Sequence, residues 1–111
     1  MRVVIEAVDG DRVRFACVAG RADARWIGAP PTPGEHDVRL EVSGSVSAAG
    51  AGEQLEPGRL VARVEAIDDD GVVRLRLGDG LVVLDEAGPA TVVGASVEVS
   101  KALFELVPVA R

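Results

Sequence analysis

The residues of this chain best suited to acid–base chemistry lie together at Glu35, His36 and Asp37. A histidine with carboxylate neighbours suggests a supported general base. Adjacent residues of a strand point to opposite faces, however, so neither carboxylate can orient the ring as a catalytic triad requires. We therefore interpret His36 as a histidine at a strand edge, and we expect no catalytic residue and no enzymatic activity.

The acidic run Asp68 to Gly71 resembles the start of a calcium loop. An EF-hand beginning at Asp68 needs glycine at its sixth position and a bidentate glutamate at its twelfth, where this chain has Val73 and Asp79. The run is better explained as a solvated turn in which Gly71 supplies a positive φ. With one histidine and one cysteine, Cys17, in the chain, we expect neither a metal nor a cofactor.

The segment Arg21 to Trp26 is the one most suggestive of binding, because it holds the single tryptophan beside arginines and before a proline connector. Tryptophan and arginine are over-represented among interface hot spots. Trp26 either anchors a partner or covers one end of the core, and both hold if one ring edge is exposed. The predicted partner surface comprises Arg21, Arg25, Trp26, Pro30, Pro31, Glu35 and Asp37.

Short β-strands must position these residues, and the clearest are Val72 to Leu77 and Leu81 to Leu84. The turn between them reads as a two-residue loop, Asp79-Gly80, in a type I′ turn with positive φ at both residues. The predicted register pairs Leu77 with Val82, Leu75 with Leu84 and Arg74 with Asp85. It places Leu75, Leu77, Val82 and Leu84 on one buried face.

A second hairpin is predicted from Val3 to Val8 and Arg12 to Ala19, around Asp9-Gly10-Asp11. A two-residue turn would put Ile5 opposite Arg14, so we expect a three-residue loop. That loop pairs Ile5 with Phe15, Ala7 with Val13 and Glu6 with Arg14.

Further strands are predicted at Asp37 to Ser43, with Val38, Leu40 and Val42 inward, and at Leu60 to Ile67. The last strand has a phase slip, since Val97 and Val99 share one parity while Ala102, Phe104 and Leu106 share the other. A bulge near Lys101 would place both sets inside. The segment Gly44 to Gly52 reads as a mobile surface loop.

These elements predict an all-β fold, with residues 1–111 forming one domain. Six or seven antiparallel strands with short connectors suggest a small OB-like barrel, or alternatively an SH3-like barrel, because closure hides the edges of a small sheet.

The net charge of −6 argues against nucleic acid as the partner, because phosphate backbones are bound by clustered basic residues. A basic protein partner is favoured, although an acidic balance also serves solubility alone. An acid follows within six residues of Met1, and no apolar run is long enough to span a membrane. We expect a cytoplasmic protein without a membrane partner.

Several motifs together extend over most of the chain. They are Trp26-Ile27-Gly28-Ala29-Pro30, Pro33-Gly34-Glu35-His36-Asp37 with the strand to Val42, Asp69-Asp70-Gly71-Val72-Val73, Leu75-Arg76-Leu77-Gly78-Asp79, Leu81-Val82-Val83-Leu84 and Val93 to Val99. These motifs resemble those of small, mostly uncharacterised bacterial β-barrel proteins that are similar to immunity proteins encoded beside polymorphic toxins. They are structural motifs, and they transfer no known site residue. Those relatives carry a longer insert where this chain has its Gly/Ser/Ala loop.

The resemblance implies an association with toxin immunity. Together with the acidic balance and the lack of catalytic motifs, it predicts a non-enzymatic protein-binding module, an immunity protein that neutralises a basic toxin through an acidic surface. The alternative is an OB-like module that binds nucleic acid or serves as an assembly scaffold.

Overall fold

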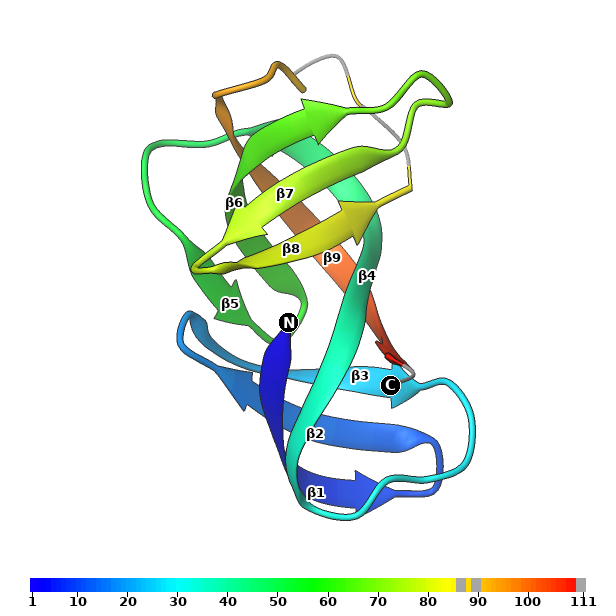
Figure 1. The fold of residues 1–111 in the computed structure, drawn as a ribbon. Coiled ribbons are helices and arrows are strands. Elements are labelled where there is room, and N and C mark those ends of the chain that lie inside the picture. The colour runs from blue at the N-terminus through cyan, green and yellow to red at the C-terminus, as the bar shows by residue number, and fades with distance from the viewer. Residues whose placement is uncertain (86–87, 89–90, 110–111) are drawn as a thin grey trace.

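The computed structural model describes residues 1–85, 88 and 91–109, and 68% of these residues lie in strands and none in a helix (Figure 1). The strands are β1 (Arg2–Asp9), β2 (Arg12–Cys17), β3 (Gly20–Trp26), β4 (Gly34–Ala48), β5 (Gln54–Glu56), β6 (Arg59–Ile67), β7 (Val73–Leu77), β8 (Gly80–Leu84) and β9 (Ser96–Pro108). Accordingly, no described segment is a helix with the length and hydropathy to cross a membrane.

All nine strands belong to one mixed sheet that closes in a ring, in the order β1-β2-β3-β5-β6-β7-β8-β4-β9. Additional pairings of β1 with β4, β3 with β9 and β6 with β9 create two smaller circuits. One runs through β1, β2, β3, β9 and β4, and the other through β6, β7, β8, β4 and β9. Figure 1 shows them as the lower and upper halves of the molecule, with β4 running through both.

The long pair β4 and β9 therefore belongs to both halves, and it bends where they meet. Its register shifts between Ser43 and Ser45, opposite Lys101, which has a φ of 51°. A Cβ atom at Gly44 would lie 2.7 Å from the Ser100 carbonyl oxygen, so only glycine fits this crossing. The predicted bulge near Lys101 is confirmed.

The bulge turns both parities of β9 inward, as predicted. The side chains of Val97, Val99, Ala102, Phe104 and Leu106 are all buried. They join one continuous core, in which Phe104 packs edge-on against Phe15 of β2 with ring centroids 6.4 Å apart. One strand thus supplies core residues to both halves.

The β7–β8 hairpin confirms the predicted core face but not the predicted register. Leu75 lies opposite Val82 and Leu77 opposite Gly80, so the two-residue loop is Gly78-Asp79. Of the two loop residues, only Gly78 has a positive φ, of 62°. A type II′ turn has a positive φ at its first central residue alone, whereas a type I′ turn has one at both, so this turn is of type II′. The difference from the prediction is two residues, so every side chain keeps its face.

The shifted register removes the predicted pairing of Arg74 with Asp85. Arg74 lies opposite Val83, and its guanidinium forms an ion pair with Asp68 at 3.2 Å. The four predicted core residues of the hairpin, Leu75, Leu77, Val82 and Leu84, are nevertheless all buried.

The β1–β2 hairpin has a two-residue turn, Gly10-Asp11, so the predicted three-residue loop is wrong. Ile5 still lies opposite Phe15 as predicted, because a bulge between Ile5 and Ala7 shifts the register by one residue. Ala7 consequently lies opposite Arg14, and Val13 lies opposite Val8. Because of the bulge, the hairpin can have a two-residue turn while Ile5 and Phe15 still face the core together.

The predicted all-β fold is confirmed, but the prediction of six or seven strands is wrong in number, and the predicted antiparallel direction is wrong for part of the sheet. The additional strands are β3 and β5, and three pairings are parallel: β3 with β5, β3 with β9 and β4 with β8. β4 also extends to Ala48, so the first half of the predicted loop from Gly44 to Gly52 is strand. Parallel pairs need long connections, and their partners are therefore distant in sequence.

Candidate functional site

The outer face of β1, β2 and β3 carries a ladder of ion pairs. Every second residue of β3 points outward, which places Arg21, Asp23 and Arg25 on one face. Their partners are Glu6 at 3.1 Å, Arg14 at 3.1 Å and Asp11 at 3.3 Å. The hydrogen bond to Asp23, followed by the attraction of its charge, raises the pKa of Arg14.

Trp26, at the end of β3, faces inward and is only 4% exposed. Its ring packs edge-on against His36, with centroids 5.4 Å apart, and His36 Nε2 lies 2.7 Å from the Thr32 carbonyl oxygen. Of the two interpretations of Trp26, the structure supports a core residue beneath the proline connector. A ring buried to this extent presents little area to a partner.

The carboxylates that follow the connector are held by Arg2. Asp37 lies directly opposite Arg2 in the β1–β4 pair, with a distance of 2.8 Å from Asp37 Oδ1 to Arg2 Nε. Glu35 Oε2 lies 3.5 Å from Arg2 Nη1. Pro30 is exposed and Pro31 is half-buried.

The structure thus divides the predicted partner surface. Glu35 and Asp37 come together on Arg2, whereas Arg21 lies at the opposite end of β3 from Arg25, beside Glu6. Four residues of a strand span about 13 Å, too far for the two arginines to contact the same small group.

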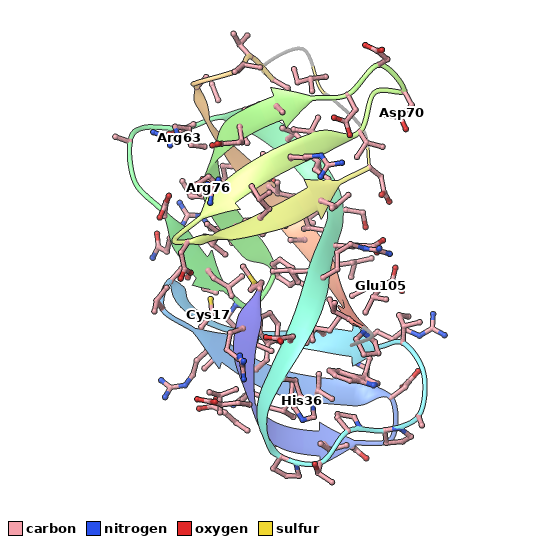
Figure 2. All side chains as sticks on the ribbon, in the orientation of Figure 1. Cys17, His36, Arg63, Asp70, Arg76 and Glu105 are labelled. Atoms are coloured by element: carbon pink, nitrogen blue, oxygen red, sulfur yellow. The ribbon has the colours of Figure 1, made fainter. Side chains whose placement is uncertain are left out.

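A cleft of about 390 Å³ opens where β3 diverges from β9, on the flank where the two halves of the molecule meet. Arg25 is the one predicted site residue that lines it. The other lining residues are Arg12, Asp23, Ser43, Pro57, Gly58, Ala102, Leu103, Phe104 and Glu105. Figure 2 shows Glu105 at mid-height of the molecule.

Five segments of the chain line this cleft: β2, β3, β4, the turn at Pro57 and Gly58, and β9. Arg12 lies opposite Arg25, Arg25 opposite Glu105, and Glu105 opposite Glu41, so a row of charged residues crosses β2, β3, β9 and β4. Arg12 and Glu105 are not among the site residues predicted from the sequence. The alternation of charged and apolar residues from Arg21 to Trp26 is typical of a strand and could have indicated β3. No local pattern in the sequence indicates that β3 pairs in parallel with β9.

Most arginines of the described chain are neutralised by ion pairs. Those with a carboxylate partner are Arg2, Arg14, Arg21, Arg25, Arg39, Arg59, Arg63, Arg74 and Arg76. Arg59 bridges Glu56 and Glu98, and the hydrogen bonds that its guanidinium donates to Glu98 and then to Glu56 raise the pKa of Arg59.

The charged side chains left over are mainly acidic. Within residues 1–85, 88 and 91–109, the acids without an ion pair are Asp9, Glu53, Asp69, Asp70, Asp79, Asp85 and Glu105, and the bases are Arg12 and Lys101. The surplus acids are spread over several turns, with Asp70 at the upper end in Figure 2. Arginine pairing therefore leaves a surface of negative potential.

The turn at Asp68 to Gly71 is local structure, as predicted. The Gly71 amide donates to the Asp68 carbonyl oxygen at 3.0 Å, the Val72 amide donates to Asp70 Oδ1 at 3.2 Å, and Gly71 has a φ of 87°. Within the described part of the chain, no three His, Cys, Asp or Glu residues are grouped so that they could hold a metal.

Comparisons of this chain with protein-family models, with curated proteins and with solved structures find no match.

Proposed function

We propose that this protein is a non-enzymatic binding module for a basic protein partner, in the manner of a cytoplasmic immunity protein that neutralises a toxin. The observation that supports the proposal most is the charge remaining after internal pairing, seven acids against two bases among the described residues. An acidic surface of this kind attracts a basic partner from a distance and orients its approach.

The proposed contact surface keeps the predicted residues next to the proline connector and leaves out Arg21, at the far end of β3, and the buried Trp26. It consists of Arg25, the connector with Pro30 and Pro31, and Glu35 with Asp37 on β4. Trp26, at the end of β3, is buried and packs against His36. Prolines restrict the connector before binding, which lowers the ordering cost of a complex.

The barrel class belongs to the same proposal. We interpret the closed sheet as an OB-like barrel, with an SH3-like barrel as the alternative. Each of the two circuits of pairings has five strands, the number in an OB-fold barrel.

The test is capture of the partner on the full chain from the native host, its identification by mass spectrometry, and binding measurements with the purified partner. We expect a basic protein whose affinity falls as salt rises. Arg25→Ala and Glu35→Ala should each weaken binding about tenfold while folding is retained, because both side chains form only exposed ion pairs.

Charge reversals at Asp68, Asp69 and Asp70 serve as the comparison. If these abolish binding while Arg25→Ala and Glu35→Ala bind normally, the contact surface is the acidic turn and our assignment is wrong. An acidic protein or a nucleic acid as the specific partner would contradict the proposed function itself and favour the alternative scaffold or nucleic-acid module.

A further inference from the structure

The cleft between β3 and β9 has an apolar wall that is open to solvent. Leu103 is 68% exposed, and Phe104 and Ala102 form the buried floor behind it. The turn at Pro57 and Gly58 closes the opposite side, held by a 2.8 Å hydrogen bond from the Ala102 amide to the Gly58 carbonyl oxygen. Such a wall suits the aliphatic stem of a long side chain.

Four charged residues line the cleft, and two of them are already neutralised. Asp23 pairs with Arg14 at 3.1 Å, and Arg25 pairs with Asp11 at 3.3 Å. Neither Arg12 nor Glu105 has an ion-pair partner among the described residues.

The two unpaired charges differ in their exposure. Arg12 is exposed and is solvated by water, whereas Glu105 is half-buried beside the apolar wall. A partly buried carboxylate gains more from a counter-ion than an exposed guanidinium does, because water screens it less. The cleft therefore favours a cation at Glu105 over an anion at Arg12.

We propose that this cleft receives an arginine or lysine side chain of the protein partner, with its cationic end on the Glu105 carboxylate and its stem on Leu103. The inference rests on the proposed function and names the chemistry of the partner's contact residue. The cleft adjoins the proposed contact surface through Arg25, which belongs to both.

The experiment uses the full chain without its partner. Amide NMR spectra are recorded during titration with n-butylguanidinium, a mimic of an arginine side chain, and in parallel with n-pentanoate, an anion of similar length. We expect saturable shifts of the Gly58, Leu103 and Glu105 amides with the guanidinium only, at a dissociation constant of about 1 to 10 mM.

Variants test the assignment of the charge. Glu105→Gln should weaken guanidinium binding about tenfold, and Arg12→Gln should strengthen it about twofold by removing a nearby like charge. Asp79→Asn is the matched control, since Asp79 is also an unpaired acid but lies in the β7–β8 turn, outside the lining of the cleft, and it should change nothing. Leu103→Ser, at an exposed position, should weaken binding without affecting the fold.

Saturable shifts with pentanoate alone, no saturable shifts with either probe, or full guanidinium binding by Glu105→Gln would each overturn the assignment. None of these results depends on the partner. The cleft assignment can therefore fail while the protein still binds a basic partner through its other acids. Equally, guanidinium binding can be observed even if partner capture contradicts the proposed function.

Discussion

At the scale of single residues, side chains divide by their place on the sheet. Leucines and valines of alternating parity fill one continuous core, while arginines and carboxylates cover the outside in pairs. Exposed pairs of this kind contribute little stability each. Stability therefore depends mainly on the core residues.

Replacement of a core leucine should be costly. Leu75 is fully buried at the centre of β7, so Leu75→Ala should lower the free energy of unfolding by about 2 to 5 kcal/mol. Leu103→Ala, at a position 68% exposed, is the matched control and should change it by less than about 0.5 kcal/mol. Urea denaturation measures both, and a change below about half a kcal/mol for Leu75→Ala would contradict this core face.

The ion pair of Glu65 with Arg76 should affect how the stability of the fold depends on pH in the acid range. A hydrogen bond from Arg76, its charge, and the charge of Arg63 lower the pKa of Glu65. A lowered pKa means that the pair stabilises the fold above the pKa of unfolded glutamate, and that this contribution is lost as pH falls through the folded value.

In Arg76→Gln, the pKa of Glu65 should rise towards its ordinary value, because the donor at 3.2 Å and its charge are removed. Carboxyl carbon NMR during an acid titration measures this change. Arg39→Gln, which removes the partner of Glu41, should leave the Glu65 titration unchanged. An unaltered Glu65 midpoint in Arg76→Gln would show that the pair does not persist in solution.

At the scale of elements, the shared pair of β4 and β9 holds the two halves together. It contributes to both circuits of pairings, and its bulge redirects β9 from the upper to the lower half of the core. A bulge of this kind is a specific structural feature that increases local bending. Perturbing it should therefore affect the whole fold and not one hairpin.

Gly44→Ala tests this element. The new Cβ would lie 2.7 Å from the Ser100 carbonyl oxygen and 2.8 Å from Val99 Cγ1, so the pair must separate, at a cost of about 1 to 3 kcal/mol. Gly50→Ala, where nothing lies within 4 Å, is the control and should be close to neutral. Equal stabilities of the two variants in thermal unfolding would disprove the close crossing.

At the scale of the whole molecule, the net charge bears on whether nucleic acid can bind. The chain carries a net charge of −6, and its described arginines are mostly committed to carboxylates. Binding to phosphate backbones depends on free basic residues that release counterions. The molecule as a whole should therefore repel nucleic acid.

Titration with single-stranded and double-stranded oligonucleotides at physiological salt should show no binding tighter than about 100 μM, the weak end of non-specific affinity. Fluorescence anisotropy of labelled oligonucleotides measures this directly. Saturable micromolar binding would refute the argument from charge and favour the alternative nucleic-acid module.

For the strands that could be predicted, the sequence by itself determined which residues face the core. The residues of the β7–β8 hairpin show why: the register moved by two, yet Leu75, Leu77, Val82 and Leu84 all remained buried, since the side-chain period is two. The parity change along β9 likewise announced the bulge at Lys101. Each of these features depends on neighbours in sequence, and local patterns encode them.

Only the tertiary structure decided the pairing of distant strands. Nothing near Arg25 or Glu105 in the sequence indicates that β3 and β9 lie side by side in parallel. The cleft, the charges left unpaired in it and the burial of Trp26 all follow from that pairing and from the β4–β9 crossing. Contacts between segments that are distant in the sequence depend on how the whole core packs. No short stretch of the sequence contains that information.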